Sequence, residues 1–261
     1  EREFQQAQRL IGQVAPDAEK RRPLDRWVGQ SLITFYDAQR RFDKVAETCR
    51  WLLDRLGAVN KADPDTQDVR LMLMQALFST TPRQLDDAKL EIDGYIRDYP
   101  GDARGLTARA QLSLLRGNRQ EALDDLTRIL AQDPEHVWAY FMRGRVALEQ
   151  GRYDAARADL TEANRRIAKY PGLEVQVHSA LASLYERTKE FELAESELKT
   201  VLDLVSKQGA RAADQRPQVV SQLVRLVYNS MKQFDRAQKL IGEYLEKDPN
   251  ERFQSARDLA F

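Results

Sequence analysis

Residues 103–136 read ARGLTARAQLSLLRGNRQEALDDLTRILAQDPEH, and residues 137–170 read VWAYFMRGRVALEQGRYDAARADLTEANRRIAKY. Placed one above the other, the two segments align Gly117 with Gly151 and Ala122 with Ala156, so each pair is 34 residues apart. A fixed period of this length is typical of stacked structural repeats. The two segments therefore predict that the chain is built from repeated units, each a pair of helices.

The repeat period assigns a role to each small residue. If Ala122 and Ala156 are numbered position 20, small residues recur at positions 8 and 20 along the chain, where only Gly or Ala lets two antiparallel helices approach closely. Position 15 ends the first helix, and glycine there adopts the left-handed conformation at little cost. Proline at position 32 stops the second helix. The small residues at position 8 are Ala76, Ala110, Gly144 and Ala182, and those at position 20 are Ala88, Ala122, Ala156, Ala194 and Ala237.

These positions resemble the tetratricopeptide repeat, whose signature runs W-x2-L-G-x2-Y, then A-x3-F, then P. The strongest match has Tyr140, Gly144, Tyr153, Ala156 and Leu160 at positions 4, 8, 17, 20 and 24. The resemblance implies an all-α fold, a right-handed solenoid of antiparallel helix pairs. It also implies a non-catalytic scaffold that binds other proteins.

The same register divides the chain into units. Phe4, Ala7, Leu10 and Ile11 repeat the pattern of Phe234, Ala237, Leu240 and Ile241, so residues 1–16 are predicted to be the second helix of a truncated repeat. The polar stretch Asp17–Asp25 is predicted to be a connection. Full repeats are predicted at 26–56, 69–100, 103–136, 137–170, 175–204 and 218–249, and 251–261 as a partial repeat or capping helix. Both ends then suggest a fragment of a larger solenoid.

Composition favours a helical protein with no strongly charged partner. Lys and Arg number 41, Asp and Glu also number 41, and the formal net charge is zero. This balance argues against a nucleic-acid or anionic-membrane surface as the main binding partner. No apolar run approaches the roughly 18 residues that a membrane span requires, so direct membrane insertion is not expected. The abundance of Arg, Ala and Asp favours a bacterial source. The single cysteine, Cys49, does not distinguish a cytoplasmic protein from an exported one.

Catalysis, metal binding and cofactor binding find little support in the sequence, which predicts none of them. The two histidines, His136 and His178, fall at a repeat boundary and at the aromatic position 4, where a structural role is expected. No paired His/Cys spacing and no G-x-x-x-x-G-K-[ST] phosphate loop occurs. Cys49 is predicted to be a buried small hydrophobe, and Asp124-Asp125 is predicted to be solvated.

In the family that this chain resembles, the first helices of successive repeats line a concave groove. The side chains at positions 2, 5, 9, 12 and 13 of each first helix point into this groove. We call these the groove positions. Aromatic and arginine side chains there have the composition of an interface hot spot. The predicted partner-binding residues are Arg70, Leu73, Arg104, Gln111, Trp138, Phe141 and Arg145, with Leu77, Thr107, Leu148, Glu149, Gln176, Ser179 and Ser183 at further groove positions. An alternative is that Trp138 and Phe141 pack within the solenoid.

The sequence therefore predicts a scaffold that binds a partner peptide or helix in this groove. One alternative is self-assembly into a homo-oligomer through apolar residues near the ends, namely Phe4, Leu10, Ile11, Phe253, Leu259 and Phe261. Another is a spacer that positions a catalytic or membrane domain of a larger protein. The Lys/Asn/Asn/Lys/Arg clamp of the chaperone-binding family members is not matched at its positions here, so binding of chaperone tails is not expected.

Overall fold

The computed structural model describes residues 6, 10, 11, 17–56, 63–207 and 215–247, and in these residues every regular element is helical. The fold is an all-α helical repeat, as the sequence predicts. The chain divides into two compact units, Glu1–Gln132 and Asp133–Phe261.

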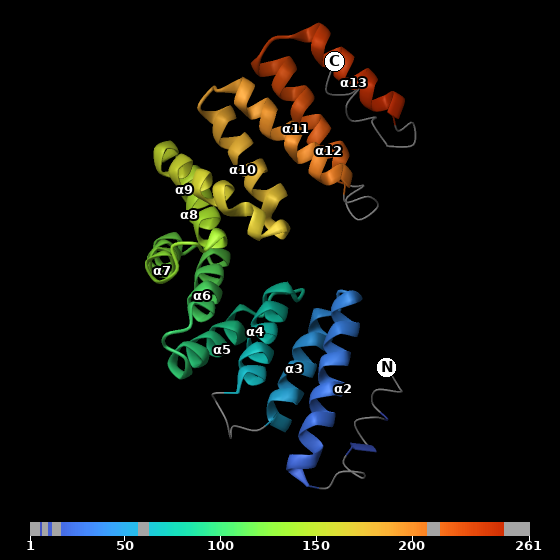
Figure 1. Cartoon of the computed structure of the whole chain (residues 1–261), viewed down its shortest axis with the longest axis vertical. Helices are drawn as coiled ribbons and strands as arrows, with labels where there is room; N and C mark the ends of the chain where they lie inside the picture. The colour runs from blue at the N-terminus through green and yellow to red at the C-terminus, as the bar shows by residue number, and fades with distance from the viewer. Residues whose placement is uncertain (1–5, 7–9, 12–16, 57–62, 208–214, 248–261) are drawn as a thin grey trace. The chain divides into compact units, whose positions relative to one another are not determined.

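The first unit contains three pairs of helices. They are α2 (Ala18–Ala38), α3 (Phe42–Leu56), α4 (Pro64–Ser79), α5 (Leu85–Asp98), α6 (Ala103–Leu115) and α7 (Arg119–Gln132). The two helices of each pair run antiparallel (Figure 1). Helices α5 and α7 end two residues before Pro100 and Pro134, because proline cannot continue the hydrogen-bonding pattern of a helix.

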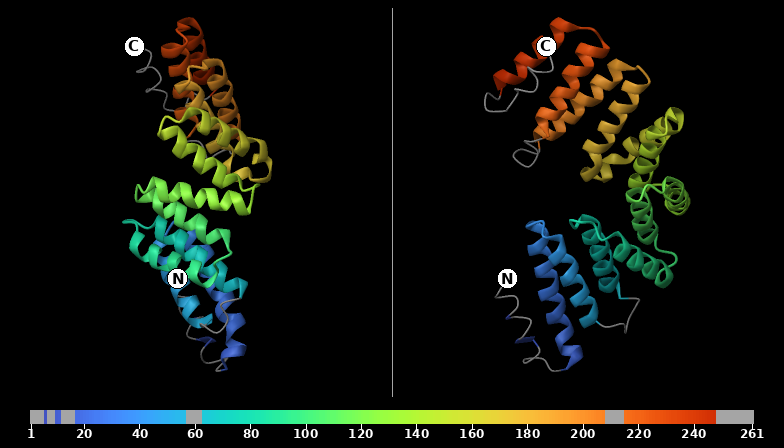
Figure 2. Two further views of the ribbon diagram at one scale, coloured as in Figure 1. Left: turned by 90° about the vertical axis from the view of Figure 1, so that its left-hand side faces the viewer. Right: turned by 180° about the vertical axis from the view of Figure 1, so that it is seen from behind.

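The second unit repeats this arrangement. It contains α8 (Val137–Glu149), α9 (Tyr153–Arg166), two short 3-10 turns η1 (Ile167–Lys169) and η2 (Pro171–Leu173), α10 (Glu174–Arg187) and α11 (Phe191–Lys207). Helix α12 (Arg216–Arg225), a π-helical turn η4 (Leu226–Ser230) and α13 (Phe234–Lys247) follow. The antiparallel order within the unit is clear from two further directions (Figure 2).

The small residues at positions 8 and 20 are buried where paired helices cross. Ala110 and Ala122 are completely inaccessible to solvent, as is Ala156. A Cβ atom on Gly144 would come within 2.9 Å of Leu160 Cγ and 3.2 Å of Asp159 Cβ. The close approach of α8 and α9 therefore depends on the absence of a side chain at residue 144.

Position 15 adopts the left-handed conformation in five repeats, and in three of them the residue is not glycine. Gly117 and Gly151 have φ values of 81° and 73°, as predicted. Arg40, Lys189 and Lys232 occupy the same position in other repeats and have φ values of 56°, 63° and 58°. In these five repeats the turn forms with or without glycine, which only makes it easier to adopt, whereas Arg83 at position 15 of the repeat at 69–100 has no positive φ.

The predicted polar connection at residues 17–25 is wrong, because most of it belongs to α2. Charged side chains of α2 bind the start of α4: Arg22 donates to Asp63 Oδ2 at 3.2 Å, and Arg26 lies 2.5 Å from Asp65 Oδ2. Asp63 in turn caps α4 by accepting from the backbone N–H of Asp65. These contacts across the repeat boundary stabilise a helix that composition alone suggested was a loop.

The repeat at residues 218–249 is irregular at Arg225. Arg225 occupies position 8, where four other repeats have Gly or Ala, and its side chain is exposed. The helix changes to a π-turn at the next residue, and Leu226 and Val227 are buried instead. The predicted terminal pieces, including Phe4, Phe253, Leu259 and Phe261, lie outside the described residues. Leu10 is exposed and Ile11 is buried.

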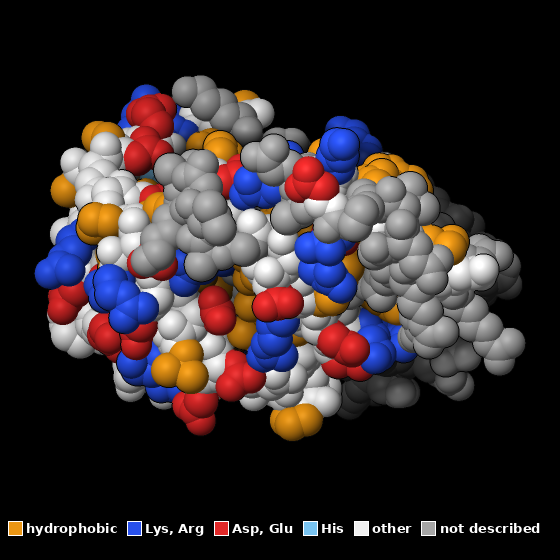
Figure 3. Space-filling model, turned by 90° about the horizontal axis from the view of Figure 1, so that it is seen from below, with side chains coloured by type: hydrophobic (Ala, Val, Ile, Leu, Met, Phe, Trp, Pro, Cys, Tyr) orange, Lys and Arg blue, Asp and Glu red, His pale blue; other side chains and the backbone are white. Residues whose placement is uncertain are grey.

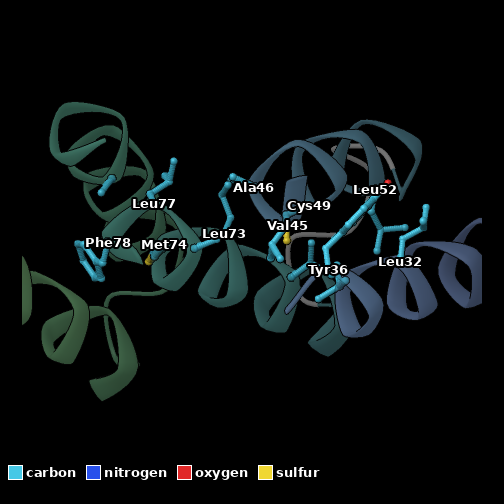
Figure 4. Packing of buried hydrophobic residues seen from close by; sticks show 14 of the residues in the cluster. Leu32, Tyr36, Val45, Ala46, Cys49, Leu52, Leu73, Met74, Leu77 and Phe78 are labelled. Carbon is cyan, nitrogen blue, oxygen red and sulfur yellow. The ribbon is translucent and has the colours of Figure 1, made fainter. Parts of the chain in front are cut away.

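The core follows the seams between helices. In the first unit one cluster joins residues of α2 to α6, and Figure 4 shows Leu73 and Leu77 of α4 in it with Ala46 and Cys49 of α3. Cys49 is fully buried, and burial raises the pKa of its thiol to about 12. Cys49 is therefore a core residue, as the sequence predicts, and its thiol is protonated at neutral pH.

Candidate functional site

A groove of about 370 Å³ lies between α8 and α10 in the second unit. Its size falls near the lower end of the range of ligand sites, roughly 300–1,000 Å³. The residues that line it are Phe141, Arg145, Leu148, Glu149, Val175, Gln176, Ser179, Ala180, Ser183 and Arg187. Those of α8 occupy positions 5, 9, 12 and 13, and α10 contributes positions 2, 5, 9 and 13. We call this surface the α8–α10 groove.

One wall of the α8–α10 groove is a face of α8. Phe141 and Leu148 present apolar surface, although each is more than nine-tenths buried. The Arg145 guanidinium lies over the Phe141 ring, 5.5 Å from its centroid, and 3.9 Å from Glu149 Oε1. A cation over an aromatic ring is attracted by the negative charge of the ring face. The contact holds Arg145 against the wall while leaving its guanidinium exposed.

The opposite wall is a face of α10 with small polar side chains. Ser183 donates to the backbone carbonyl of Ser179 at 3.0 Å, so both serines lie on one side of the helix. The Gln176 amide nitrogen can donate to the carbonyls of Gly172 and Leu173 at 3.1 and 3.3 Å, which leaves its oxygen available as an acceptor. Arg187 ends the wall and donates to the Leu148 carbonyl at 3.4 Å.

The start of α8 is fixed by His136. Its Nδ1 accepts from the backbone N–H of Ala139 at 3.2 Å, which makes His136 the N-cap. Desolvation lowers the pKa of His136. The capping role requires the unprotonated nitrogen, and burial favours this neutral form of the ring. His136 also contacts the Trp138 ring edge-on at 6.4 Å between centroids, and the half-buried Trp138 does not line the α8–α10 groove.

The groove positions of α4 are closed. Arg70 donates to Asp98 Oδ2 at 2.9 Å, lies over the rings of Tyr95 and Tyr99, and has a side chain only 13% exposed. Leu73 is completely buried. The structure therefore places these two predicted binding residues in contacts within the first unit.

The groove positions of α6 are more accessible. Arg104 is exposed and donates to Asp68 Oδ1 at 2.9 Å and Gln67 Oε1 at 2.8 Å. Gln111 is half-buried on the same helix. Of the seven predicted binding residues, the structure brings Phe141 and Arg145 together in one groove and distributes the others elsewhere.

Two features were missed by sequence reasoning. Arg187 lies at groove position 13 of its repeat, equivalent to Glu149, so the register alone could have identified it. The second feature is a repeated ion pair between paired helices, with two hydrogen bonds in each copy. Arg109 binds Asp125 at 2.7 and 2.6 Å, and Arg143 binds Asp159 at 2.8 and 2.7 Å.

The prediction that Asp125 is a solvated residue is wrong, since only 2% of it is exposed. The period would have revealed the pairs, because both partners recur after 34 residues. Hydrogen bonding to Asp125 and Asp159 raises the pKa of Arg109 and Arg143. These arginines are therefore structural charges that join the two helices of one repeat.

Catalytic or metal chemistry gains no positive support from the described residues. Among them, no cluster of three His, Cys, Asp or Glu side chains has the geometry to hold a metal ion. His178 Nδ1 lies 2.6 Å from Glu197 Oε2, across the α10–α11 pair. This contact joins paired helices, as the Arg–Asp pairs do.

The charged side chains are mixed on the face shown in Figure 3, where acidic and basic groups alternate. This pattern agrees with the zero net charge of the whole sequence. In the part of the chain that the structure describes, no helix combines the length and the apolar character needed to cross a bilayer.

Comparisons with known proteins agree with this architecture. Residues 113–171 match a family model described as tetratricopeptide repeat. No curated protein matches the sequence. Among solved structures, a tetratricopeptide repeat protein from Parabacteroides merdae is similar over 90% of this chain and 89% of that one, with a TM-score of 0.55 and 16% identity.

Two further structures extend the comparison. The structure from the functional characterization of Pseudomonas aeruginosa pilF is similar over 69% of this chain and 75% of that one, with a TM-score of 0.57 and 19% identity. A chain of the APC/C hetero-tetramer Cut9–Hcn1 is similar over 99% of this chain, with a TM-score of 0.68 and 16% identity, although this spans only 45% of that chain. Likenesses at these identities establish the fold.

Proposed function

We propose that this chain, in which residues 113–171 match a tetratricopeptide-repeat model and the fold is that of such repeats, is a non-catalytic scaffold that binds a peptide or helix of a partner protein. Proteins built from this repeat are generally interaction scaffolds. The binding site in this proposal is the α8–α10 groove. The observation that carries it is the register of the lining: side chains at groove positions of two successive first helices face a common hollow.

The physical basis is a combination of apolar and polar surface. Val175 is half-buried and offers apolar area whose burial is worth about 25 cal/mol per Å², and the small exposed parts of Phe141, Leu148 and Ala180 add to it. The two serines and Gln176 offer hydrogen bonds that can orient a ligand. A few oriented polar groups around an apolar surface are the usual composition of a ligand site.

The proposal is tested by site-specific crosslinking. A photoreactive phenylalanine analogue is introduced at Ser183 in the groove, or at Ser196 on α11 as the matched exposed control. In an extract of the source organism, a protein should crosslink at residue 183 and not at residue 196. A Ser183→Trp variant, which fills the groove, should lose the same protein in a pull-down, and Ser196→Trp should retain it.

Equal crosslinking at both serines, or retention of the partner by Ser183→Trp, would contradict groove binding. Circular dichroism of both tryptophan variants establishes that each remains folded. The exposed positions of both serines predict that it does.

A further inference from the structure

The charge in the α8–α10 groove is unevenly compensated. Arg145 and Arg187 reach it from opposite walls, and Glu149 is the one acidic residue of its lining. Glu149 lies 3.9 Å from Arg145, whereas Arg187 has no carboxylate partner in any ion pair of the described residues. Arg187 donates a hydrogen bond of 3.4 Å to the Leu148 carbonyl.

Other arginines of the same unit show the contrast. Arg143 is held by two hydrogen bonds to Asp159, Arg166 lies 2.9 Å from Glu135 Oε1, and Arg157 contacts Glu190. Each of these side chains is neutralised within the unit. Arg187 therefore presents a positive charge beside the apolar part of the groove lining.

Charge and apolar surface together define the ligand chemistry. A purely apolar segment would cover Phe141 and Leu148 but would bury the Arg187 guanidinium against an uncharged group, at a cost in desolvation. A purely acidic segment would pair with the arginine and leave the apolar surface exposed. A carboxylate close to a large apolar side chain satisfies both, because arginine binds carboxylates through two parallel hydrogen bonds.

We infer that the α8–α10 groove selects a short partner segment in which an Asp or Glu lies near a large apolar residue, with the carboxylate bound by Arg187. This inference rests on the proposed function and adds the chemical class of the segment. In this arrangement Phe141 and Leu148 contact the apolar side chain of the ligand, and Gln176 and Ser183 contact its backbone. Arg145, held over Phe141, supports the same charge preference from the opposite wall.

The test uses short fluorescein-labelled peptides of Gly and Ser that contain one Leu and, one to four residues away, one Glu, Gln or Lys. Binding to the full chain is followed by fluorescence anisotropy at low and high salt. The Glu peptides should bind about tenfold more tightly than the Gln peptides, which corresponds to about 1.4 kcal/mol, and the difference should shrink at high salt. The Lys peptides should bind most weakly.

The decisive variant is Arg187→Glu, which should favour the Lys peptides over the Glu peptides. Arg165→Glu is the matched control, since Arg165 is also in the last turn of its helix and is exposed. It should leave the order unchanged.

The outcomes separate this inference from the proposed function. Equal binding of Glu and Gln peptides, or an order that Arg187→Glu does not change, overturns the acidic preference. If Ser183→Trp then abolishes binding of the Gln peptides, the groove still binds peptides. Failure of every peptide to bind overturns the inference, and crosslinking at Ser183 then decides the proposed function independently.

Discussion

Helices α4 and α10 show how one repeat register gives two different surfaces. At groove positions 5 and 9, α4 has Leu73 and Leu77, whereas α10 has Ser179 and Ser183. Both leucines are completely buried in the core of the first unit, and both serines line the α8–α10 groove. The register predicts the direction of these side chains, but their chemistry decides whether that face is buried in the core or stays open.

The largest expected effect is the loss of stability when the side chain at groove position 5 is shortened to alanine. Leu73→Ala removes a fully buried side chain and should lower the free energy of unfolding by about 2–5 kcal/mol. Ser179→Ala, at the equivalent position of α10, should change it by less than about 0.5 kcal/mol. Urea unfolding with hydrogen-exchange mass spectrometry of the full chain measures both. Similar losses at the two positions would remove the distinction between a closed and an open face.

Arginine provides the next test of the same distinction. Arg70→Ala should destabilise the first unit by about 1–3 kcal/mol, because it removes a hydrogen bond to Asp98 and the contacts with two tyrosine rings. Arg145→Ala should cost less than about 1 kcal/mol, since its ion pair is long and exposed. Thermal unfolding monitored by circular dichroism measures the difference, with Arg70→Lys separating charge from stacking. A larger loss for Arg145→Ala would show that its side chain is structural.

A smaller effect on stability is expected at position 15, in the turn between the two helices of a repeat. Left-handed residues occur at this position in both units. Lys189→Gly should stabilise the second unit by up to about 1 kcal/mol, because glycine adopts a φ of 63° without strain, although it also costs entropy on folding. Gly151→Ala should have the opposite sign, since its φ is 73°. Chemical denaturation of both variants provides the measurement. Destabilisation by Lys189→Gly would mean that the lysine side chain makes a contact worth more than the strain.

The smallest effect is a pH dependence confined to the second unit. Both histidines lie there, and burial lowers the pKa of His136. A lowered pKa means that the unfolded chain binds the proton more readily. The stabilisation from neutral His136 is therefore complete above about pH 6.5 and declines as the pH falls through the unfolded value.

His136→Asn retains a capping side chain and removes the titration. The stability of the variant should therefore vary less than that of the wild type between about pH 7 and pH 5. Hydrogen exchange of α8 at several pH values measures this, with α4 as the internal reference. Identical pH profiles for the two proteins would show that His136 is not the titrating group.

Much of the fold is predictable because it depends on local spacing. Small residues at positions 8 and 20, glycine at position 15 and the prolines each have a physical reason to recur, and the structure confirms the helix pairs that they predict. The start of α2 was not predictable in this way. It depends on Arg22 and Arg26 meeting Asp63 and Asp65, which lie about 40 residues away in the sequence.

The candidate site was predictable only in part, for a related reason. The family register identifies Phe141, Arg145, Ser179 and Ser183 as groove residues, and these line one hollow. It also identifies Arg70 and Leu73, whose exposure is lost to contacts with α5 and to the core of the first unit. The repeat register predicts the direction in which each side chain points. Whether that helix face is exposed to solvent depends on which neighbouring helix packs over it.

The repeated Arg–Asp pairs have a consequence for how this sequence can change over time. Asp125 and Asp159 are buried, and each depends on one arginine of its own repeat. Losing one partner of a buried pair costs about 3–5 kcal/mol, whereas replacing both with apolar residues of similar volume is often neutral. Residues 109 and 125 are therefore expected to co-vary, as are residues 143 and 159. Homologues should differ from this sequence at both members of a pair or at neither.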